Sequence, residues 1–517
     1  MNGAECLLRT LLAHGIDTSF MNPGTSEMQF VAALDRVPAM RGVLCLFEGV
    51  CAGAADGYAR MLRRPAATLL HLGPGLGNAL SNLHNARKAR SPVVNIVGQH
   101  STGHLRFDAP LTADIEAFAR PVSHYVKTVE QADRMGSEAA AAIRAARTPP
   151  GQVATLIVPA DFSWSDGGEP AAAIELAASS VPDADCVRAA ASVLRSGEPT
   201  GLLLGGGALL APGLDAAGRL AAKTGAHVFA NRYSARLEYG SGKFLPRRLA
   251  YFPEPAEAAL AGLKHLILVE SAAPVSFFGY PGRSSLLAPE DCAIHVLSTV
   301  EQDGAEALRA LAEECGAEDA APAKPSSLRP ELPTGAALTS DAIGRALAWL
   351  LPDGAIVSDE MVSSSEAIMR HLECAPGFDL LPVTGGSIGQ GLPVALGAAV
   401  ACPDRKVVAL EADGSGMYTL QALWTMARES LDVLTVVLAN RRYRILDIEM
   451  QRTGAGAMGS CADRMLDIGR PDLDWVKLAE GLGVEASRAA TADEFMTQFQ
   501  DAARQRGPRL IEAVIGD

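Results

Sequence analysis

The sequence has few aromatic residues, no closely paired cysteines and no long hydrophobic run. Only 5% of its 517 residues are aromatic, and its nine cysteines are scattered without a CxxC pair. This pattern is typical of reduced thiols in a cytoplasm, and it argues against a disulfide framework or a zinc site. No apolar run approaches the roughly 18 residues of a membrane span, and residues 1–15 lack the basic and apolar regions of a signal peptide. We therefore expect a cytoplasmic protein without a membrane partner.

Positive charge is also scarce. The 45 lysine and arginine residues are outnumbered by 59 aspartate and glutamate residues, so the net charge is −14. Such a charge balance argues against nucleic acid, and we expect no nucleic-acid partner. An anionic substrate would have to be captured by local dipoles rather than by the field of the whole protein.

What the sequence does have is length and apolar content in a regular alternation. Hydrophobic residues make up 48% of the chain, and a chain of this length exceeds what one hydrophobic core supports. Short apolar runs alternate with helical stretches, which predicts parallel sheets with helices on both faces. The predicted strands are 18–21, 43–47, 67–72, 92–97, 201–204, 227–230, 266–269, 293–297, 355–358, 406–411 and 433–438, with turns rich in glycine and proline such as 73–77.

Two stretches of linker-like composition divide this alternation. Residues 163–185 are polar and alanine-rich, and residues 316–334 are rich in proline, alanine and glutamate. The predicted fold class is therefore α/β, with three doubly wound parallel-sheet domains at 1–165, 185–318 and 335–517.

Polar residues follow two predicted strands of the last domain. Asp413 comes after strand 406–411 and Asn440 after strand 433–438, at a spacing of 27 residues. The carboxyl ends of strands are where open α/β sheets bind ligands. One carboxylate, one amide and the backbone carbonyl of Arg442 are oxygen ligands of the kind Mg²⁺ prefers, and backbone N–H groups of Gly414 and Ser415 suit phosphates. Each residue alone fits an ordinary turn or strand end equally well.

The pattern Ala412-Asp413-Gly414 with Ala439-Asn440 resembles the cofactor signature of thiamine diphosphate enzymes. That signature is Gly-Asp-Gly followed, one strand–helix–strand unit later, by Asn-Asn, so both proposed ligands match and the first residue of each motif is alanine here. Residues 47–60 closely resemble the family's segment around its catalytic glutamate, which is Glu48 in this sequence. The resemblance implies that Glu48 bonds the aminopyrimidine ring and favours the imino tautomer that removes the thiazolium proton.

The resemblance extends over essentially the whole chain, with pyrimidine-binding, central and diphosphate-binding domains in that order. Residues 22–27 and 73–78 are similar to loops that line the family's active site. Residues 385–393 are similar to the segment that supplies an apolar wedge under the cofactor, and residues 358–363 to the loop that meets the diphosphate. The cofactor-binding residues implied are Asn22, Pro23, Gly24, Glu48, Glu360, Ile388, Asp413, Gly414, Ser415, Asn440 and Tyr443, with Asp413, Asn440 and Arg442 holding Mg²⁺.

Within the family, the sequence is similar to acetolactate synthases and to benzoylformate-type decarboxylases. His71 stands where those decarboxylases carry an active-site histidine, which predicts a second catalytic residue beside Glu48; a structural, hydrogen-bonded histidine is the alternative. The decarboxylases' second histidine has no counterpart in residues 273–280, where Phe277 and Phe278 would make the pocket apolar. The function predicted is a non-oxidative decarboxylase, carboligase or both, a carbon–carbon lyase or transferase acting on a 2-oxo acid.

Two other functions stay open, and one motif stays unassigned. The chain could be a lyase of 2-hydroxyacyl- or oxalyl-CoA, or a non-catalytic homologue that binds thiamine diphosphate. The sequence offers no adequate case for FAD on the central domain. His100 and His104 follow strand 92–97, but a loop position explains them equally and their spacing is no zinc motif by itself. The resemblance also implies a homodimer as the minimal active unit, paired into a homotetramer.

Overall fold

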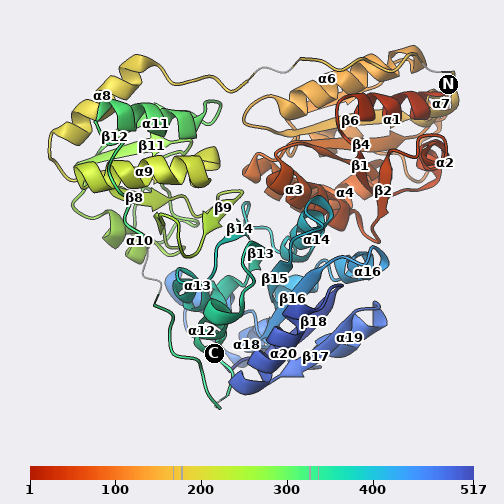
Figure 1. Cartoon of the computed structure of the whole chain (residues 1–517). Coiled ribbons are helices and arrows are strands. Elements are labelled where there is room, and N and C mark those ends of the chain that lie inside the picture. Colours follow the sequence, from red (N-terminus) through yellow and green to blue (C-terminus); the bar gives the residue numbers. More distant parts are fainter. Residues whose placement is uncertain (167, 176–177, 325–327, 336, 517) are drawn as a thin grey trace.

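The computed structural model describes residues 1–517 except 167, 176–177, 325–327, 336 and 517. Three sheets, in which all strands but one run parallel to their neighbours, are each covered by helices and form three lobes (Figure 1). The predicted fold class is therefore confirmed. The predicted linkers 163–185 and 316–334 fall partly outside the described residues, and the predicted domain boundaries stay predictions. No helix in the described part of the chain is long and apolar enough to cross a membrane.

The first sheet has six parallel strands in the order β2-β1-β3-β4-β6-β5. Neighbouring strand residues enter two different cores, Phe20 and Leu70 on one face and Met21 and Leu69 on the other. Burial on both faces explains why these strands are continuous apolar runs. The elements are α1 (Gly3–Ala13), β1 (Thr18–Asn22), η1 (Thr25–Glu27), α2 (Met28–Leu34), β2 (Arg41–Leu44), α3 (Glu48–Leu62), β3 (Ala66–Leu70), α4 (Leu72–Ala89), β4 (Val93–Gln99), η2 (Leu105–Phe107), α5 (Ile115–Ala119), β5 (Tyr125–Thr128), η3 (Ala132–Arg134), α6 (Met135–Arg147), β6 (Val153–Pro159) and α7 (Ala160–Trp164).

The second sheet has five parallel strands in the order β10-β8-β7-β11-β12. It too is covered on both faces, with Leu202 and Ile267 in one core and Leu203 and Leu266 in another. The elements are α8 (Ala184–Arg195), β7 (Thr200–Leu204), η4 (Gly206–Leu209), α9 (Ala211–Thr224), β8 (His227–Ala230), β9 (Leu237–Tyr239), β10 (Arg247–Arg248), α10 (Pro253–Leu260), β11 (His265–Val269), β12 (Ala293–Ser298) and α11 (Gly304–Glu314).

The third sheet has the order β17-β18-β16-β15-β13-β14-β9 and is parallel except for β9. Val357 and Val408 face one core, while Ile356 and Val407 face another. Its elements are α12 (Ser340–Leu350), β13 (Ala355–Glu360), η5 (Val362–Ser364), α13 (Ser365–Leu372), β14 (Phe378–Pro382), α14 (Gly391–Ala401), β15 (Val407–Ala412), α15 (Asp413–Gly416), α16 (Gln421–Arg428), β16 (Val433–Ala439), α17 (Arg444–Arg452), α18 (Ser460–Leu466), α19 (Trp475–Gly481), β17 (Glu485–Ala489), α20 (Ala492–Arg504) and β18 (Arg509–Val514).

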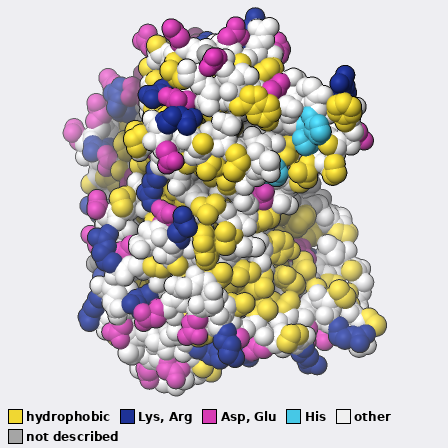
Figure 2. All heavy atoms as spheres, turned by 90° about the vertical axis from the view of Figure 1, so that its right-hand side faces the viewer, with side chains coloured by type: hydrophobic (Ala, Val, Ile, Leu, Met, Phe, Trp, Pro, Cys, Tyr) yellow, Lys and Arg dark blue, Asp and Glu magenta, His cyan; other side chains and the backbone are white. Residues whose placement is uncertain are grey.

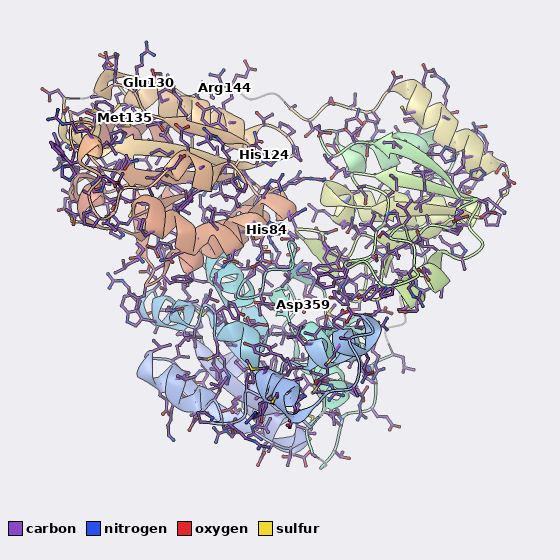
Figure 3. All side chains as sticks on the ribbon, turned by 180° about the vertical axis from the view of Figure 1, so that it is seen from behind. His84, His124, Glu130, Met135, Arg144 and Asp359 are labelled. Carbon is purple, nitrogen blue, oxygen red and sulfur yellow. The ribbon has the colours of Figure 1, made fainter. Side chains whose placement is uncertain are left out.

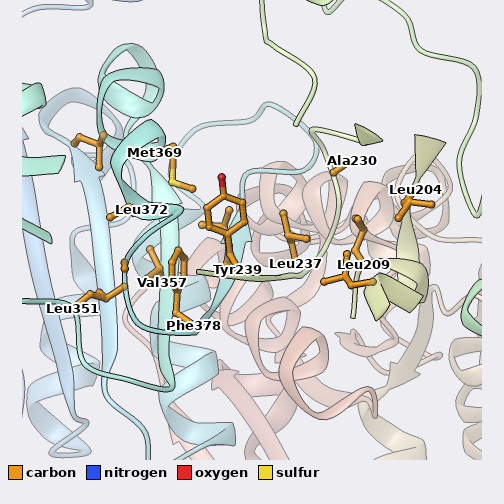
Figure 4. Close-up of a cluster of buried hydrophobic side chains, with 14 of the residues drawn as sticks. Leu204, Leu209, Ala230, Leu237, Tyr239, Leu351, Val357, Met369, Leu372 and Phe378 are labelled. Atoms are coloured by element: carbon orange, nitrogen blue, oxygen red, sulfur yellow. The ribbon is translucent and has the colours of Figure 1, made fainter. Parts of the chain in front are cut away.

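Strand β9 belongs to the central stretch of sequence but pairs with the last sheet. Tyr239 lies opposite Phe378 in the antiparallel register, and their rings meet edge to face with centroids 5.6 Å apart. Figure 4 shows Leu237 and Tyr239 bridging the two lobes, with side chains of both in one buried cluster. The central and C-terminal lobes therefore share a continuous hydrophobic core.

The N-terminal lobe meets the C-terminal lobe through helices α3 and α14. A Cβ on Gly57 would lie 2.2 Å from the carbonyl oxygen of Val394, and a Cβ on Gly397 would lie 1.8 Å from that of Ala54. Only glycine allows this approach, so the two helices pack backbone to backbone. Glu48 begins α3, and the predicted wedge segment, 385–393, runs into the start of α14. The same packing thus fixes two predicted parts of the site.

One predicted turn is wrong. Residues 73–77 form the first turns of α4, which begins at Leu72, rather than a loop. Pro74 is tolerated there because the first N–H groups of a helix have no intrahelical partner. Burial of Leu72 and Leu76 outweighs the poor helix propensity of the neighbouring glycines.

Candidate active site

The first cluster of predicted site residues lies where the order of the first sheet reverses. From β1 the chain first adds β2 on one side and then β3 on the other, and Asn22 pairs in register with Leu70. Glu48 follows β2, while His71 follows β3. Such a reversal leaves a crevice at the carboxyl ends of the strands, where α/β sheets bind ligands. Asn22, Pro23, Gly24, Glu48 and His71 therefore share one edge of the sheet.

Glu48 is the first residue of α3 and lies against the start of α4. Its side chain is buried, with the residue 8% exposed. Asn78 donates a hydrogen bond from Nδ2 to Oε2 of Glu48 at 3.0 Å. A Cβ on Gly75 would lie 3.0 Å from Oε1. The glycine-rich start of α4 thus leaves room for the carboxylate, which one side-chain amide holds in place.

His71 pairs with a glutamate that the sequence alone did not single out. Nδ1 of His71 lies 2.7 Å from Oε2 of Glu27, which also accepts the backbone N–H of Gly24 at 2.8 Å. Glu27 is fully buried, and burial raises its pKa although the charge of His71 and the N–H of Gly24 lower it. A carboxylate on Nδ1 fixes the ring orientation and leaves Nε2 to exchange a proton.

Two glycines make room for this pair. A Cβ on Gly24 would lie 2.3 Å from Nδ1 of His71, and a Cβ on Gly98 would lie 1.6 Å from Oε1 of Glu27. The glutamate and the histidine therefore fill a space that side chains on β4 and on the loop after β1 would otherwise occupy. The signal for Glu27 was present in the segment 22–27, but its partner lies 44 residues away in sequence.

The second cluster lies at the corresponding reversal of the third sheet, between β13 and β15. Asp413 follows β15 and is 3% exposed. Its two oxygens accept backbone N–H groups, Oδ1 from Gly414 at 2.9 Å and Oδ2 from Arg441 at 2.6 Å. Burial raises the pKa of Asp413 to about 6, and these N–H groups lower it. A cation beside the carboxylate would favour its charged form.

Asn440 follows the next strand and completes the edge. Its Oδ1 accepts the N–H of Arg442 at 3.0 Å, in a turn where Arg441 adopts the left-handed conformation with φ 61°. The ring of Tyr443 packs on Gly414, since a Cβ there would lie 2.5 Å from the ring. Gly414 and Ser415 are buried in the short helix α15.

The donor atoms at this edge are carboxylate, amide and carbonyl oxygens, which are the ligands that a hard cation such as Mg²⁺ prefers. No cluster of three or more His, Cys, Asp or Glu residues able to hold a metal occurs in the described part of the chain. A metal at this edge would therefore take Asp413 together with amide, carbonyl and phosphate oxygens. Mg²⁺ is commonly held by one or two carboxylates with substrate phosphates and water.

The predicted wedge segment, 385–393, is held by hydrogen bonds from two sides. Glu360 is 1% exposed and accepts the N–H groups of Gly389 at 2.9 Å and Gly391 at 2.6 Å. Helix α4 of the first lobe binds the segment from the other side: Asn82 donates to the carbonyl of Gly389, Asn85 donates to that of Ser387, and His84 lies 3.1 Å from the carbonyl oxygen of Gly385. Figure 3 shows His84 where the upper lobe meets the lower one, above Asp359.

Glu360 is therefore placed to support the backbone that presents Ile388, which is half-buried. Beside it lies a second buried carboxylate, Glu411, whose two oxygens have no hydrogen-bond partner among the described residues. Burial raises the pKa of Glu360 to about 7, while burial together with the negative charge of Glu360 raises the pKa of Glu411 well above its usual range. The pair holds a proton near neutral pH.

Two sheet edges, each at a reversal of strand order and each carrying charged groups, give this α/β protein two candidate ligand-binding edges. Comparison with known sequences identifies the cofactor. Residues 1–122 match the N-terminal thiamine pyrophosphate-binding domain of thiamine pyrophosphate enzymes, and residues 362–513 match the C-terminal one; pyrophosphate and diphosphate name the same group. The chain belongs to the thiamine diphosphate enzyme family.

Relatives within this family carry two kinds of name. The chain is 52% identical over 517 residues to IlvX of Mycobacterium tuberculosis, which is named as a candidate acetolactate synthase large subunit, covering 100% of this chain and 99% of that one. It is 30% identical to benzoylformate decarboxylase of Pseudomonas aeruginosa over 97% of this chain and 96% of that one. The solved 4-hydroxybenzoylformate decarboxylase of Rhodococcus jostii superposes with a TM-score of 0.88 at 26% identity, covering 100% and 99% of the two chains.

Proposed function

We propose that this protein is a thiamine diphosphate- and Mg²⁺-dependent enzyme that removes carbon dioxide from a 2-oxo acid without oxidation. The remaining acyl unit leaves as an aldehyde or joins a second carbonyl compound. The observation that carries the proposal is the combination of Glu48, Asp413 and Asn440 at the two sheet edges with the buried Glu27–His71 pair. The relatives' names, which include both a decarboxylase and acetolactate synthases, support the same reaction class.

When bound, thiamine diphosphate supplies a carbon nucleophile for the 2-oxo carbonyl and stabilises the electron pair left by carbon dioxide. Glu48 would hold the aminopyrimidine ring through its carboxyl group. Asp413, Asn440 and the carbonyl of Arg442 would hold Mg²⁺ and, through it, the diphosphate, with Gly414 and Ser415 beside it. Ile388 would contact the bound cofactor, and Tyr443 borders the same edge.

His71 would move protons at the reacting carbon through Nε2, while Glu27 keeps the ring in one orientation. A decarboxylase must add a proton where carbon dioxide left, so an acid–base pair at this edge favours the decarboxylase over the carboligase. The side of the pocket formed by residues 273–280 is apolar and supplies no second acid–base group, so it does not favour the decarboxylase. Phe277 packs directly on Gly386, where a Cβ would lie 2.3 Å from the ring, and residues 273–280 contain no histidine.

The minimal active unit proposed is a homodimer, assembled further into a homotetramer. Large apolar side chains are exposed beside each half-site: Leu46 is 46% exposed next to Glu48, and Tyr418 is 54% exposed after α15. Figure 2 shows hydrophobic side chains gathered over the middle of the face that it presents. A second copy of the chain would cover such a surface and bring two half-sites together.

A CoA lyase is the second candidate, because a cavity of about 1430 Å³ lies between the first and central lobes, beside the glycines of η4. The place where a phosphate would take backbone N–H groups is, however, already filled. Glu270 accepts the N–H of Gly207 and that of Gly304, each at 2.5 Å, and its residue adopts φ 47°. The protein's own carboxylate thus occupies this anion position, which weighs against a nucleotide or FAD there.

The test is product analysis after reconstitution. Protein stripped with a chelator would receive Mg²⁺ and thiamine diphosphate, and carbon dioxide release from pyruvate and from benzoylformate would be followed. Cofactor-dependent release with free aldehyde is the expected result; an acyloin product would make the enzyme a carboligase. Binding of CoA to the cavity beside η4 would favour the CoA lyase over the decarboxylase. Tight cofactor binding with no turnover of any 2-oxo acid would favour the non-catalytic homologue.

A further inference from the structure

Three histidines and a glutamate collect at the edge of the first sheet. His71 follows β3 and His100 follows β4. The two strands are neighbours in the sheet, with Leu70 of β3 paired in register with Val97 of β4. The rings of His100 and His104 meet edge to face with centroids 5.2 Å apart. Glu27 is fully buried, His71 and His100 are half-buried, and His104 is exposed. The four residues therefore run from the interior to solvent.

His100 is the middle member of this row and has an unused nitrogen. Its Nε2 is buried and has no hydrogen-bond partner among the described residues. Burial lowers the pKa of His100, and positive charge on His104 and on His71 lowers it further, so both neighbours lie within electrostatic reach. An imidazole that is neutral at physiological pH can take up a proton at one nitrogen and release one from the other.

The other charged groups around this loop are engaged elsewhere. Asp161 of α7 accepts the N–H of Thr102 at 3.0 Å and its hydroxyl at 2.6 Å, which anchors the loop between the two histidines. The guanidinium of Arg106 lies 4.7 Å from the ring centre of Phe107, and that ring also contacts His104. No metal-binding cluster occurs in the described part of the chain, so a zinc site does not account for these histidines.

We propose that His100 and His104 form a proton relay that connects the Glu27–His71 pair to solvent. A proton taken up from solvent at His104 passes to His100 and then to Nε2 of His71, and each ring returns to the neutral form as it gives up the proton, so no other co-reactant is needed. His71 is the catalytic residue of the proposed function, on which this inference rests, and His100 and His104 are positioning residues that act through it. The relay takes the place of the second histidine that residues 273–280 do not supply.

The electrostatic part of the relay can be tested without cofactor. Histidine ring protons would be titrated by NMR in the cofactor-free protein, with the ten histidines assigned through single His→Asn variants. We expect His100 to titrate below the usual range and to move up by about 0.5 pH unit in H104N and in H71N, since each removes a like charge. H124N, on the same lobe (Figure 3), is the matched control and should leave His100 unchanged. A His100 that titrates normally and ignores all three variants would overturn the relay.

The second readout is turnover of the reconstituted enzyme. H100N should lower kcat about 10-fold and leave KM unchanged. This loss is smaller than the roughly 10²–10⁴-fold loss expected when a direct acid–base group is removed. Added imidazole should restore part of the rate and shift the acidic limb of the pH profile. Unchanged kcat in H100N would overturn the relay even if the NMR coupling were present. A wild-type enzyme that binds cofactor but turns over no 2-oxo acid would contradict the proposed function, while the titrations would still decide whether the histidines are coupled.

Discussion

The two half-sites occupy equivalent places in their sheets but are built from opposite kinds of contact. At the edge of the first sheet, the charged groups contact mainly other side chains: Glu27 contacts His71 in addition to the backbone N–H of Gly24, and Glu48 contacts Asn78. At the edge of the third sheet, the carboxylates of Glu360 and Asp413 contact backbone N–H groups. The His71 side chain is 23% exposed, whereas Asp413 is 3% exposed.

This difference fits two different tasks. A side-chain pair can change protonation state with little movement, because either partner can carry the proton. Backbone N–H groups cannot be titrated, so a carboxylate that accepts them keeps a fixed position and suits a fixed cation. We therefore interpret the first edge as the part that handles protons and the third as the part that holds the charged end of the cofactor. The predictions below test this division.

Replacing Glu48 by Gln should have the largest effect. The variant keeps the shape of the side chain but cannot provide a carboxylate to the aminopyrimidine ring, so the cofactor should remain bound while its activation slows. We expect deuterium exchange at the thiazolium carbon to slow about 10²–10⁴-fold. Glu130→Gln, an exposed carboxylate on the same lobe (Figure 3), is the control. Unchanged exchange in Glu48→Gln would remove this residue from the proton-handling edge.

Replacing Asp413 by Ala should weaken binding of the cofactor, rather than slow deuterium exchange at the thiazolium carbon of bound cofactor. Loss of the only carboxylate proposed for the cation should weaken Mg²⁺-dependent retention of thiamine diphosphate about 100-fold, comparable to the upper end of losses caused by outer-shell changes. Retention would be measured by gel filtration with and without Mg²⁺. Asp472→Ala is the matched control, since Asp472 is an exposed carboxylate that pairs with Arg441 on the same edge. Normal retention in Asp413→Ala would show that the metal assignment is wrong.

Much of this architecture could be predicted from sequence, because strand-end chemistry is local. The predicted strands at 227–230, 433–438 and 406–411 lie on β8, β16 and β15 within a residue or two. The positions of Asp413 and Asn440 at the sheet edge could be predicted because each residue closely follows one of these strands in the sequence. By contrast, the contact between Glu27 and His71 joins loops after β1 and β3, and no local pattern encodes it.

Other features depended on packing that sequence periodicity does not contain. Strands β6, β14 and β18 have no counterpart among the predicted strands, although they lie inside the sheets. The glycines at 73–77 favoured a turn, but burial against α3 and α5 makes the segment helical. The role of Glu360 in supporting Gly389 and Gly391 likewise requires two segments 29 to 31 residues apart to meet.

The buried carboxylates of the third sheet make a pH-dependent prediction. Burial raises the pKa of Glu360 to about 7 in the folded protein from an ordinary value of 4.5. A raised folded-state pKa contributes stability below the ordinary value, and that contribution is lost as pH rises through about 7. The free energy of unfolding of cofactor-free protein should therefore fall by up to about 3 kcal/mol between these limits. Glu411→Gln should flatten the fall, because the second buried carboxyl group, whose pKa is also raised, then no longer titrates.

Thermal unfolding of both proteins across this pH range, in the presence of chelator, would measure the effect. Glu429→Gln is the control, since Glu429 pairs with exposed Arg41 at the surface. Parallel stability curves for wild type and Glu411→Gln would mean that the pKa of Glu411 is not raised in the folded protein.

The smallest effect is expected at Gly98, which lies on β4 beside Glu27 at the edge of the first sheet. A Cβ at this position would lie 1.6 Å from Oε1 of Glu27, so Gly98→Ala must displace a buried side chain held by His71 and Gly24. Overpacking of this kind costs about 1–3 kcal/mol of unfolding free energy. Gly77→Ala is the matched control, because nothing lies within 4 Å of a Cβ there and alanine favours the helix by roughly 0.5–1 kcal/mol.

A double-mutant cycle separates this steric cost from a general intolerance of β4. Glu27→Ala removes the atoms that the new methyl group would meet, so adding Gly98→Ala to that variant should cost far less than adding it to the wild type. Equal costs in both backgrounds would mean that Gly98 is required for the strand itself. A smaller cost beside Glu27→Ala would show instead that the glycine is there to admit the carboxylate. The proton-handling edge would then depend on a residue with no side chain, as the cation-holding edge depends on Gly414 beneath Tyr443.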